Sequence, residues 1–437
     1  MVTKPTMTTP ASHANAARNR CAETDPLAAF QAVRARTLAL VEPLSAEDMM
    51  VQTLPEASPV KWHLAHTSWF FESFVLAPFV TAYRSFHPDF KWLFNSYYQS
   101  FAAFPDKHLR ASFSRPSLEE ILAYRRHVDA AMLEFAEQIL DQPEAAARCI
   151  LGVHHEQQHQ ELILTDLLHG FASNPLHPAY RDLDEISREA AQPLAFTDWP
   201  GGLVETGADA SEGFSYDHEQ PRHRAWIDSF RLANRLVTNG EFAAFMEDGG
   251  YSRPELWLSD GWQLVQSEGW QAPLYWRKTA DHWRVMSLHG ELPLDAIGSY
   301  PACHVSYYEA DALARWAGKR LPTEEEWEHA AQGVRVEGNL LEQERYVPLP
   351  AAGTNAPLQL FGDCWEWTAS AYLPYAGFRP LAGALGEYNG KFMSGKMVLR
   401  GGSFATPASH IRASYRNFFV PETRWQFSGI RLAETSA

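Results

Sequence analysis

The chain has 437 residues, a formal net charge of −16, and contents of 46% hydrophobic and 13% aromatic residues. It is too long for one ordinary core, so we expect two domains, and its aromatic content excludes a disordered protein. The acidic balance argues against a nucleic-acid surface, because phosphate binding needs clustered basic residues. No apolar run in the sequence approaches the length of a membrane-spanning helix.

The cysteines are sparse and widely spaced, at Cys21, Cys149, Cys303 and Cys364. That spacing is not a disulfide framework, so we expect a reducing, cytoplasmic environment. Residues 1–25 are rich in Thr, Ala, Asn and Pro and lack an apolar core segment. They are expected to form a flexible tail rather than a signal peptide.

Apolar residues recur with helical spacing in 27–42, 59–78, 117–140 and 144–170, which predicts a four-helix bundle over 26–170. Ser117 and Glu120 have the spacing of a capping box at the start of the third helix. A long aromatic loop from Phe86 to Phe113 separates the second and third helices. A loop of this length in a compact domain is usually functional.

The residue composition changes after a connector at 171–195. From 196 to 437, Gly, Pro and Trp become frequent and the strands are short. Helical stretches are expected only at 239–248, 306–318 and 323–332. This half is therefore predicted to be an irregular α+β domain, which makes the whole chain α+β.

Helical spacing places two histidines on one face. His155 and His159, in the run HEQQH, lie one helical turn apart and project side by side. Leu151 precedes them and Leu162 follows them on the same apolar stripe, so the pair should be buried. Two buried imidazoles in register favour a shared metal ion. A pair of hydrogen-bonded core histidines is the alternative.

A third ligand is expected on the helix that follows Ser58-Pro59. His66 falls on the apolar face of this segment with Trp62 and Trp69, and His63 shares part of that face as a competing candidate. No cysteine lies near either helix, which disfavours a structural zinc site. Two helices of one bundle would then supply three histidines and leave open positions on the metal.

A zinc hydrolase is a competing interpretation of the same run. HEQQH fits the HExxH pattern, in which Glu156 would be the general base. The extended pattern fails, because Thr165 stands where a further histidine would be. Glu185 or Glu189 could act as a more distant ligand, although both lie in the connector. A binding module without catalysis is the second alternative, and it requires no metal.

Several runs in the second half resemble the formylglycine-generating-enzyme-like, or sulfatase-modifying-factor, domain. In chain order these runs are YDHEQPRH at 216–223, VTNGEF at 237–242, GGY at 249–251, RLPTEEEWE at 320–328, WEWT at 365–368, RGGS at 400–403 and GIRLA at 429–433. Formylglycine chemistry itself is excluded, since it needs a cysteine pair after RGGS. Here Phe404 follows Ser403, and no cysteine occurs after Cys364.

The first half resembles a DinB-type four-helix bundle. Its fusion to the second domain is typical of the ergothioneine-pathway sulfoxide synthases, or hercynine oxygenases. The resemblance implies a mononuclear non-haem Fe(II) enzyme that uses O₂ to join a thiol to carbon 2 of the hercynine imidazole. The three-histidine motif of that family matches His66, His155 and His159 in this sequence.

The same resemblance implies roles for further residues. Tyr97 and Tyr98 match the segment that carries active-site tyrosines, one of which would give a proton or an electron. Gln158 would address the substrate imidazole. Asn417 would hold the hercynine carboxylate. Phe418 and Phe419 would face its trimethylammonium group, which prefers aromatic surfaces. The site is therefore expected between the two domains.

The resemblance does not determine which thiol is the donor. Family members use cysteine or γ-glutamylcysteine, and Arg110 and Arg115 match the region that grips the donor's carboxylates. The loop 103–108 departs from the usual basic, Pro-rich pattern. A selenoneine-forming branch that uses a selenosugar is therefore the alternative. The oligomeric state is not indicated by the sequence.

Overall fold

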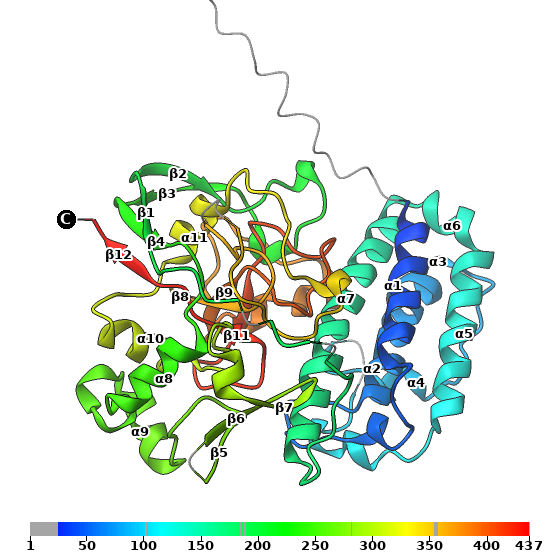
Figure 1. Ribbon diagram of the computed structural model, residues 1–437. Coiled ribbons are helices and arrows are strands. Elements are labelled where there is room, and N and C mark those ends of the chain that lie inside the picture. The colour runs from blue at the N-terminus through cyan, green and yellow to red at the C-terminus, as the bar shows by residue number, and fades with distance from the viewer. Residues whose placement is uncertain are drawn as a thin grey trace, which may run out of the picture.

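The computed structural model describes residues 25–100, 103–183, 185–187, 189–280, 282–353 and 357–436. The expected tail lies almost wholly outside these residues, as does Cys21. A helical bundle and a mixed α+β domain lie side by side, with α7 (Pro143–Ser173) along the boundary between them (Figure 1). Within the described residues, no helix is both long enough and apolar enough to cross a membrane.

The bundle is built from four long helices. They are α1 (Pro26–Val41), α2 (Val60–Phe71), α5 (Leu118–Glu134) and α7, and shorter segments α3 (Ala77–Phe79), α4 (Phe90–Leu93) and α6 (Ala136–Leu140) join them. Helix α2 packs against both α5 and α7, and α1 packs along α7. The expected capping box is present: the Ser117 hydroxyl accepts from the Glu120 amide, and the Glu120 carboxylate accepts from the Ser117 amide.

Helix α2 continues directly into a π-helical turn, Glu72–Leu76. Glu72 is buried, and its two carboxylate oxygens accept hydrogen bonds from the hydroxyls of Tyr83 and Tyr124 at 2.6 and 2.5 Å. A buried carboxylate needs such partners. The turn thus ties α2 to the chain that follows it and to α5.

Among its described residues, the second domain contains four small sheets. Strands β1 (Phe196–Trp199), β4 (Phe230–Ala233) and β12 (Ala433–Thr435) form one antiparallel sheet, and β2 (Gly202–Thr206) and β3 (His223–Ile227) form a hairpin. Strands β5 (Trp276–Thr279), β6 (His282–Ser287) and β7 (Gly290–Pro293) form an antiparallel meander. The fourth sheet has the order β10 (Asn417–Phe419), β9 (Met397–Arg400), β8 (Trp365–Ala371), β11 (Ser428–Gly429), in which only β8 and β11 are parallel.

The helices of this domain are α8 (Asn239–Glu247), α9 (Ser259–Ser267), α10 (Tyr307–Trp316) and α11 (Glu324–Ala331). Three of them match the expected stretches, and capping boxes start them at Thr238, Ser306 and Thr323. Helix α9 was not predicted, because it has only nine residues and contains Gly261, a poor helix former. The predicted α+β fold class, with a helical first half, is confirmed.

The long aromatic loop is more ordered than a plain connection. It holds α4 and a 3₁₀ segment, Lys107–Ser112. Other 3₁₀ turns occur at Asp48–Met50, Ala210–Glu212, Asp217–Glu219, Gly250–Ser252, Pro254–Leu256, Leu294–Ile297, Leu341–Gln343, Gly383–Glu387 and Gly390–Phe392. The segment Lys107–Ser112 carries Arg110, which is buried.

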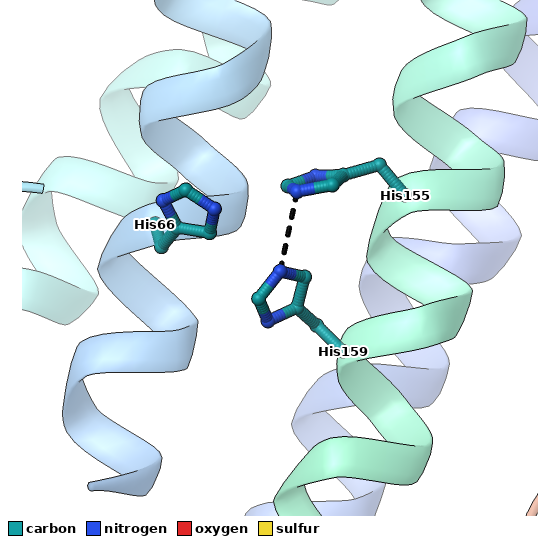
Figure 2. A group of neighbouring side chains, drawn as sticks. All are labelled: His66, His155 and His159. Atoms are coloured by element: carbon teal, nitrogen blue, oxygen red, sulfur yellow. Dashed lines mark hydrogen bonds between the residues drawn. The ribbon is translucent and has the colours of Figure 1, made fainter. Parts of the chain in front are cut away.

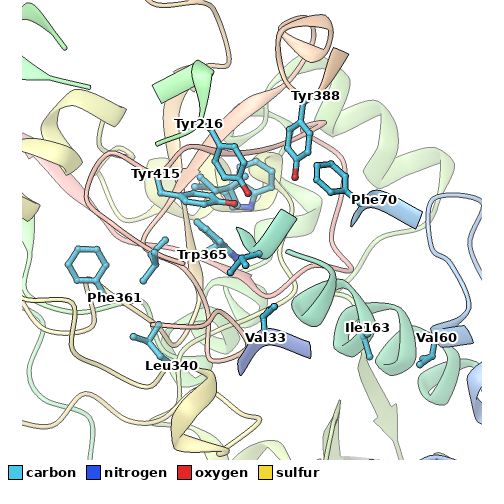
Figure 3. Close-up of a cluster of buried hydrophobic side chains, with 14 of the residues drawn as sticks. Val33, Val60, Phe70, Ile163, Tyr216, Leu340, Phe361, Trp365, Tyr388 and Tyr415 are labelled. Atoms are coloured by element: carbon cyan, nitrogen blue, oxygen red, sulfur yellow. The ribbon is translucent and has the colours of Figure 1, made fainter. Parts of the chain in front are cut away.

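One apolar core continues across the two halves. Figure 3 shows Val33, Val60 and Ile163 of the bundle in the same cluster as Trp365 and Tyr415. A single carboxylate on α7, that of Glu161, accepts hydrogen bonds from Trp365 Nε1, Ser403 Oγ and Thr406 Oγ1 at 2.6–2.7 Å. The domains are therefore joined by both apolar packing and directed polar contacts, which fixes their relative position.

Candidate metal centre and substrate cavity

Three buried histidines meet between α2 and α7. The ring nitrogens of His66, His155 and His159 that could bind a metal all lie within 4.8 Å of one another. Figure 2 shows His66 reaching across from α2 to the pair on α7, where the Nε2 atoms of His155 and His159 are 3.2 Å apart. The one-turn spacing on α7 thus brings both rings to the helix that carries the third.

The ring of His66 is held between two indoles. Trp62 and Trp69 stack on its two sides, with ring centroids at 4.4 and 5.1 Å. Its Nδ1 lies 2.6 Å from the carbonyl oxygen of Phe94, which can only accept, so Nδ1 carries the proton. The lone pair of Nε2 is then directed away from this contact and available to a metal.

His63 lies behind the cluster rather than in it. Its Nδ1 is 2.7 Å from Nδ1 of His159, and its Nε2 is 3.0 Å from an Asp166 carboxylate oxygen. If His159 presents the lone pair of Nε2 to a metal, its Nδ1 proton is donated to His63. His63 then donates its own Nε2 proton to Asp166. The structure thus brings together His66, not His63, with the pair on α7.

The electrostatics of the cluster suit a cation. Burial is the main cause that holds the pKa values of His66, His155 and His159 well below the usual range, and neighbouring cationic or histidine side chains add to it. The rings are therefore neutral at pH 7 and have lone pairs to share. In the described part of the chain, the buried Nδ1 of His155 has no hydrogen-bond partner. Neutral imidazoles suit Fe(II), among other divalent metals.

Glu156 is not placed to act as a base for a hydrolase. One of its oxygens contacts Arg125 and Thr37 at 2.5 and 2.7 Å, and the other contacts Arg34 at 3.1 Å. Burial opposes ionisation, but these arginines outweigh it and lower the pKa of Glu156 to about 2. The carboxylate is a locked anion bound by side chains of α1 and α5, so the HExxH interpretation loses its base.

A cavity of about 280 Å³ opens beside the histidines and is lined from both domains. His155 and His159 are among its lining residues, while His66 is enclosed by its two tryptophans. Gln158, Asn417, Phe418 and Phe419 also line it. The expected substrate residues of the two halves therefore share one space next to the three-histidine cluster.

The two candidate tyrosines differ in their surroundings. Tyr97 lines the cavity, whereas Tyr98 is fully buried between Trp69 and Phe74, at ring distances of 5.7 and 5.1 Å. Their hydroxyls are 3.5 Å apart. Burial raises the pKa of both phenols, so each keeps its proton at neutral pH. Only Tyr97 presents its side chain to the cavity.

The two candidate arginines also lie in different surroundings. Arg110 lines the cavity, stacks on Trp62 with its guanidinium carbon 3.5 Å from the ring centroid, and donates from Nη1 to Ser58. Its buried Nη2 has no hydrogen-bond partner among the described residues. Burial lowers the pKa of Arg110 to about 9, so it is still a cation at pH 7. Arg115 is exposed and lies outside the cavity, because the 3₁₀ segment ends before it.

At the opposite wall, β10 supplies the expected hercynine-facing residues. The side-chain oxygen of Asn417 accepts a hydrogen bond from the backbone amide of Phe418 at 2.9 Å. The side-chain NH₂ group of Asn417 can therefore donate to other partners. Phe418 stacks on Tyr372 with centroids 4.1 Å apart, and Phe419 meets Trp425 edge-on at 5.8 Å. This end of the cavity is aromatic and only half-buried.

Some cavity residues had no signal in the sequence. Tyr388, Tyr415 and His410 all line the cavity, and the ring centroid of Tyr388 lies 5.8 Å from that of His155. They stand more than 200 positions after α7 in the chain. No local periodicity marks them, so only the packing of the two domains reveals them.

Comparison with known proteins gives matches in both halves. The model of the DinB superfamily matches residues 29–163, and that of the sulfatase-modifying factor enzyme 1-like domain matches residues 185–357 and 357–436. A hercynine oxygenase of Mycolicibacterium smegmatis is 35% identical over 92% of this chain and 96% of its own. The hercynine oxygenase of Mycobacterium tuberculosis gives the same identity and coverage. Ergothioneine biosynthesis protein 1 of Schizosaccharomyces pombe is 30% identical, over 51% of this chain and 28% of its own.

The fold and the site thus define a DinB-type bundle with a three-histidine cluster, fused to a sulfatase-modifying-factor-like domain. The chain belongs to the hercynine oxygenase family. The family predicted from the sequence motifs is therefore confirmed.

Proposed function

We propose that this protein is an Fe(II)- and O₂-dependent sulfoxide synthase that joins a thiol to carbon 2 of the hercynine imidazole. One molecule each of hercynine, thiol and O₂ would give one sulfoxide and one water. The C–H and S–H bonds break, a C–S bond forms, and one oxygen atom stays on sulfur. The observation that carries the proposal is the shared cavity, which joins the three-histidine cluster to Gln158 and β10.

His66, His155 and His159 would hold the metal through neutral imidazole nitrogens. Bound Fe(II) would supply O₂ activation and a site for the donor's sulfur. The chain's own contribution is to hold the reactants side by side, which can remove about 7–11 kcal/mol from the barrier for a well-oriented pair. The tryptophans around His66 and the buried rings on α7 keep bulk water from this side of the site.

Hercynine would bind between α7 and β10. Gln158 would contact the imidazole, and the free NH₂ of Asn417 would donate to the carboxylate. A trimethylammonium group cannot donate hydrogen bonds and is attracted to aromatic faces. Phe419 and Trp425, with the exposed parts of Phe418, would supply them at the half-buried end of the cavity.

Tyr97 would be the proton donor of the loop. Its phenol lines the cavity and stays protonated at neutral pH, whereas Tyr98 packs behind it. Tyr388 is a second phenol on the cavity wall and the nearest competitor for this role. Both side chains line the cavity beside the cluster.

Arg110 would bind an anionic group of the donor. A buried cation with an unused N–H group favours a carboxylate ligand, because charged hydrogen bonds are the stronger ones. This favours cysteine or γ-glutamylcysteine over a neutral selenosugar, for which the names of the matched relatives give no support. Arg115, exposed and outside the cavity, is left out of this assignment.

The proposal is tested by anaerobic reconstitution with Fe(II), followed by hercynine, air and either cysteine, γ-glutamylcysteine or a selenosugar. Mass spectrometry should find a sulfoxide adduct of hercynine with one of the two thiols. Product from the selenosugar alone would replace the donor and keep the metal and hercynine assignments. Absence of any hercynine adduct with an iron-loaded protein would refute the function.

A further inference from the structure

A histidine of the second domain, His218, lines the same cavity. It lies in the 3₁₀ turn Asp217–Glu219 and is buried, and its ring meets Phe418 of β10 edge-on with centroids 5.9 Å apart. Asn417 and Phe418 line the cavity together with it. The ring of His218 therefore belongs to the end of the cavity that is proposed for the betaine group of hercynine.

The position of His218 is fixed through both its backbone and its side chain. The guanidinium of Arg416 donates to the His218 carbonyl oxygen at 2.9 Å. Glu324 in turn accepts from Arg416 at 2.8 and 2.9 Å. Nδ1 of His218 lies 2.6 Å from the hydroxyl of Tyr372, whose ring stacks on Phe418. An imidazole held in this way is ordered before a ligand arrives, which lowers the entropic cost of binding.

The contact with Tyr372 indicates which nitrogen of His218 carries the proton. Burial, with smaller effects of three neighbouring arginines, holds the pKa of His218 well below its usual range, so the ring is neutral. A neutral imidazole has one nitrogen that accepts and one that donates. The Tyr372 hydroxyl has no other hydrogen-bond partner in the described part of the chain, and a phenol is the better donor of the two groups. Tyr372 therefore donates to Nδ1, and Nε2 of His218 carries the N–H group.

This N–H group is an unused donor. Nε2 of His218 is buried and has no hydrogen-bond partner among the residues that the structure describes. Buried polar groups in native proteins nearly always have a partner, so a ligand or a water molecule is expected to accept this bond. The side-chain NH₂ group of Asn417, which lines the same cavity, is a second available donor. Two neutral donors match the two oxygens of a carboxylate.

We infer that the Nε2–H group of His218 donates to the carboxylate of hercynine and so makes His218 a second carboxylate-binding residue beside Asn417. The inference rests on the proposed function and extends it to the choice of substrate. The pocket would select a betaine that keeps its carboxylate over the corresponding decarboxylated amine. A neutral donor suits this position, because an imidazolium would repel the trimethylammonium group on the adjacent carbon of the substrate.

A neighbouring aromatic face is the alternative partner of this N–H group. The ring of Tyr216 lies 5.5 Å from that of His218, at an interplanar angle of 85°. An N–H group directed at such a face makes a weak hydrogen bond. His218 would then have a structural role alone, and ligand binding through it would not depend on the carboxylate.

The test compares two ligands by calorimetry on the metal-loaded protein without O₂. Hercynine carries the carboxylate, whereas N,N,N-trimethylhistamine has the same imidazole and trimethylammonium group without it. His218→Phe and His218→Met remove the N–H group, and His218→Gln keeps one near the position of Nε2. His329→Phe is the matched control, because it replaces a half-buried histidine of the same domain that packs against Trp199 outside the cavity.

We expect His218→Phe and His218→Met to weaken hercynine binding by about tenfold to a hundredfold, the effect of one hydrogen bond to a charged group, and to leave trimethylhistamine binding unchanged. His218→Gln should recover part of the loss, and the control should bind both ligands as the wild type does. Wild-type hercynine affinity in His218→Met would overturn the inference, as would equal weakening of both ligands. Wild-type protein that binds metal but neither ligand would instead refute the proposed function.

Discussion

Nδ1 of His63 lies 2.7 Å from Nδ1 of His159, and the carboxylate of Asp166 lies 3.0 Å from the other nitrogen of His63. The Ser58 amide donates to the same carboxylate oxygen at 2.7 Å, which holds Asp166 in place. Outer partners of this kind fix the ring orientation and tautomer of a metal-binding histidine. His63 is thus placed to support the candidate metal site without belonging to the proposed ligand set.

This relationship gives the first prediction. His63→Ala should weaken Fe(II) or Co(II) affinity by about tenfold to a hundredfold, since the support of His159 is lost while all three ligands remain. His66→Ala should abolish tight binding. Competition with a chelator measures both, and His87→Ala, an exposed histidine of the same domain, is the control. Wild-type affinity in His63→Ala, or full occupancy in His66→Ala, would contradict the assignment.

A second prediction concerns the stability provided by Glu156. Glu156→Gln should lower the free energy of unfolding by about 3 kcal/mol, because it leaves Arg34 and Arg125 buried without their anion. Glu344→Gln removes the partner of Arg36 from a largely exposed pair. It should have little effect. Chemical denaturation of both variants measures the difference, and equal stabilities would refute the buried ion pair.

The same carboxylate gives a pH dependence with a definite sign. The pKa of Glu156 is lowered from 4.5 to about 2 in the folded protein, since its arginine contacts outweigh burial. Its stabilising effect is therefore fully present above about pH 4.5 and is lost as the pH falls through about 2. The difference in unfolding temperature between wild type and Glu156→Gln should shrink over this range. A difference that grows with acid would contradict the direction of the shift.

The third prediction separates the loop tyrosines. Tyr97→Phe should divert O₂ from coupling to thiol oxidation while hercynine still binds, because the phenol that faces the cavity is lost. Tyr98→Phe should keep most of the coupling, since that hydroxyl lies behind Tyr97. The ratio of sulfoxide to oxidised thiol measures both. A normal ratio in Tyr97→Phe would remove it from the mechanism and turn attention to Tyr388.

A fourth prediction distinguishes the roles of Arg110 and Arg115 in donor binding. Arg110→Ala should raise the KM of a carboxylate-bearing donor by about tenfold or more, the effect of one charge-assisted hydrogen bond, and leave hercynine affinity unchanged. Arg115→Ala is its matched control and should leave the donor's KM at the wild-type value. A larger effect from Arg115 would mean that the loop rearranges when the donor binds.

The sequence sufficed to predict much of the bundle, because its helices carry long apolar stripes and clear start signals. The one-turn spacing of His155 and His159, and the position of His66 beside Trp62, sufficed for the expected ligand set that the structure brings together. The choice of His66 over His63 needed the crossing of α2 and α7. The sequence favours His66 from its apolar face but keeps His63, which shares part of that face, as a competing candidate.

The site residues that the sequence could not assign depend on contacts between distant segments. Arg110 and Arg115 look alike as residues, and only the 3₁₀ segment Lys107–Ser112 turns the first inward. Tyr388, Tyr415 and His410 belong to loops whose path is set by tertiary packing, not by local periodicity. Helix α9 was missed because it is short and contains a glycine.

The most direct test of the central claim is a single turnover with ¹⁸O₂ on the iron-loaded protein, with hercynine and the preferred thiol. We expect one ¹⁸O atom in the sulfoxide product of the wild type and no product from His66→Ala. The product should also disappear when iron is removed and return when it is restored. Adduct formation that survives the loss of His66 and of iron, or a product without ¹⁸O, would contradict the account.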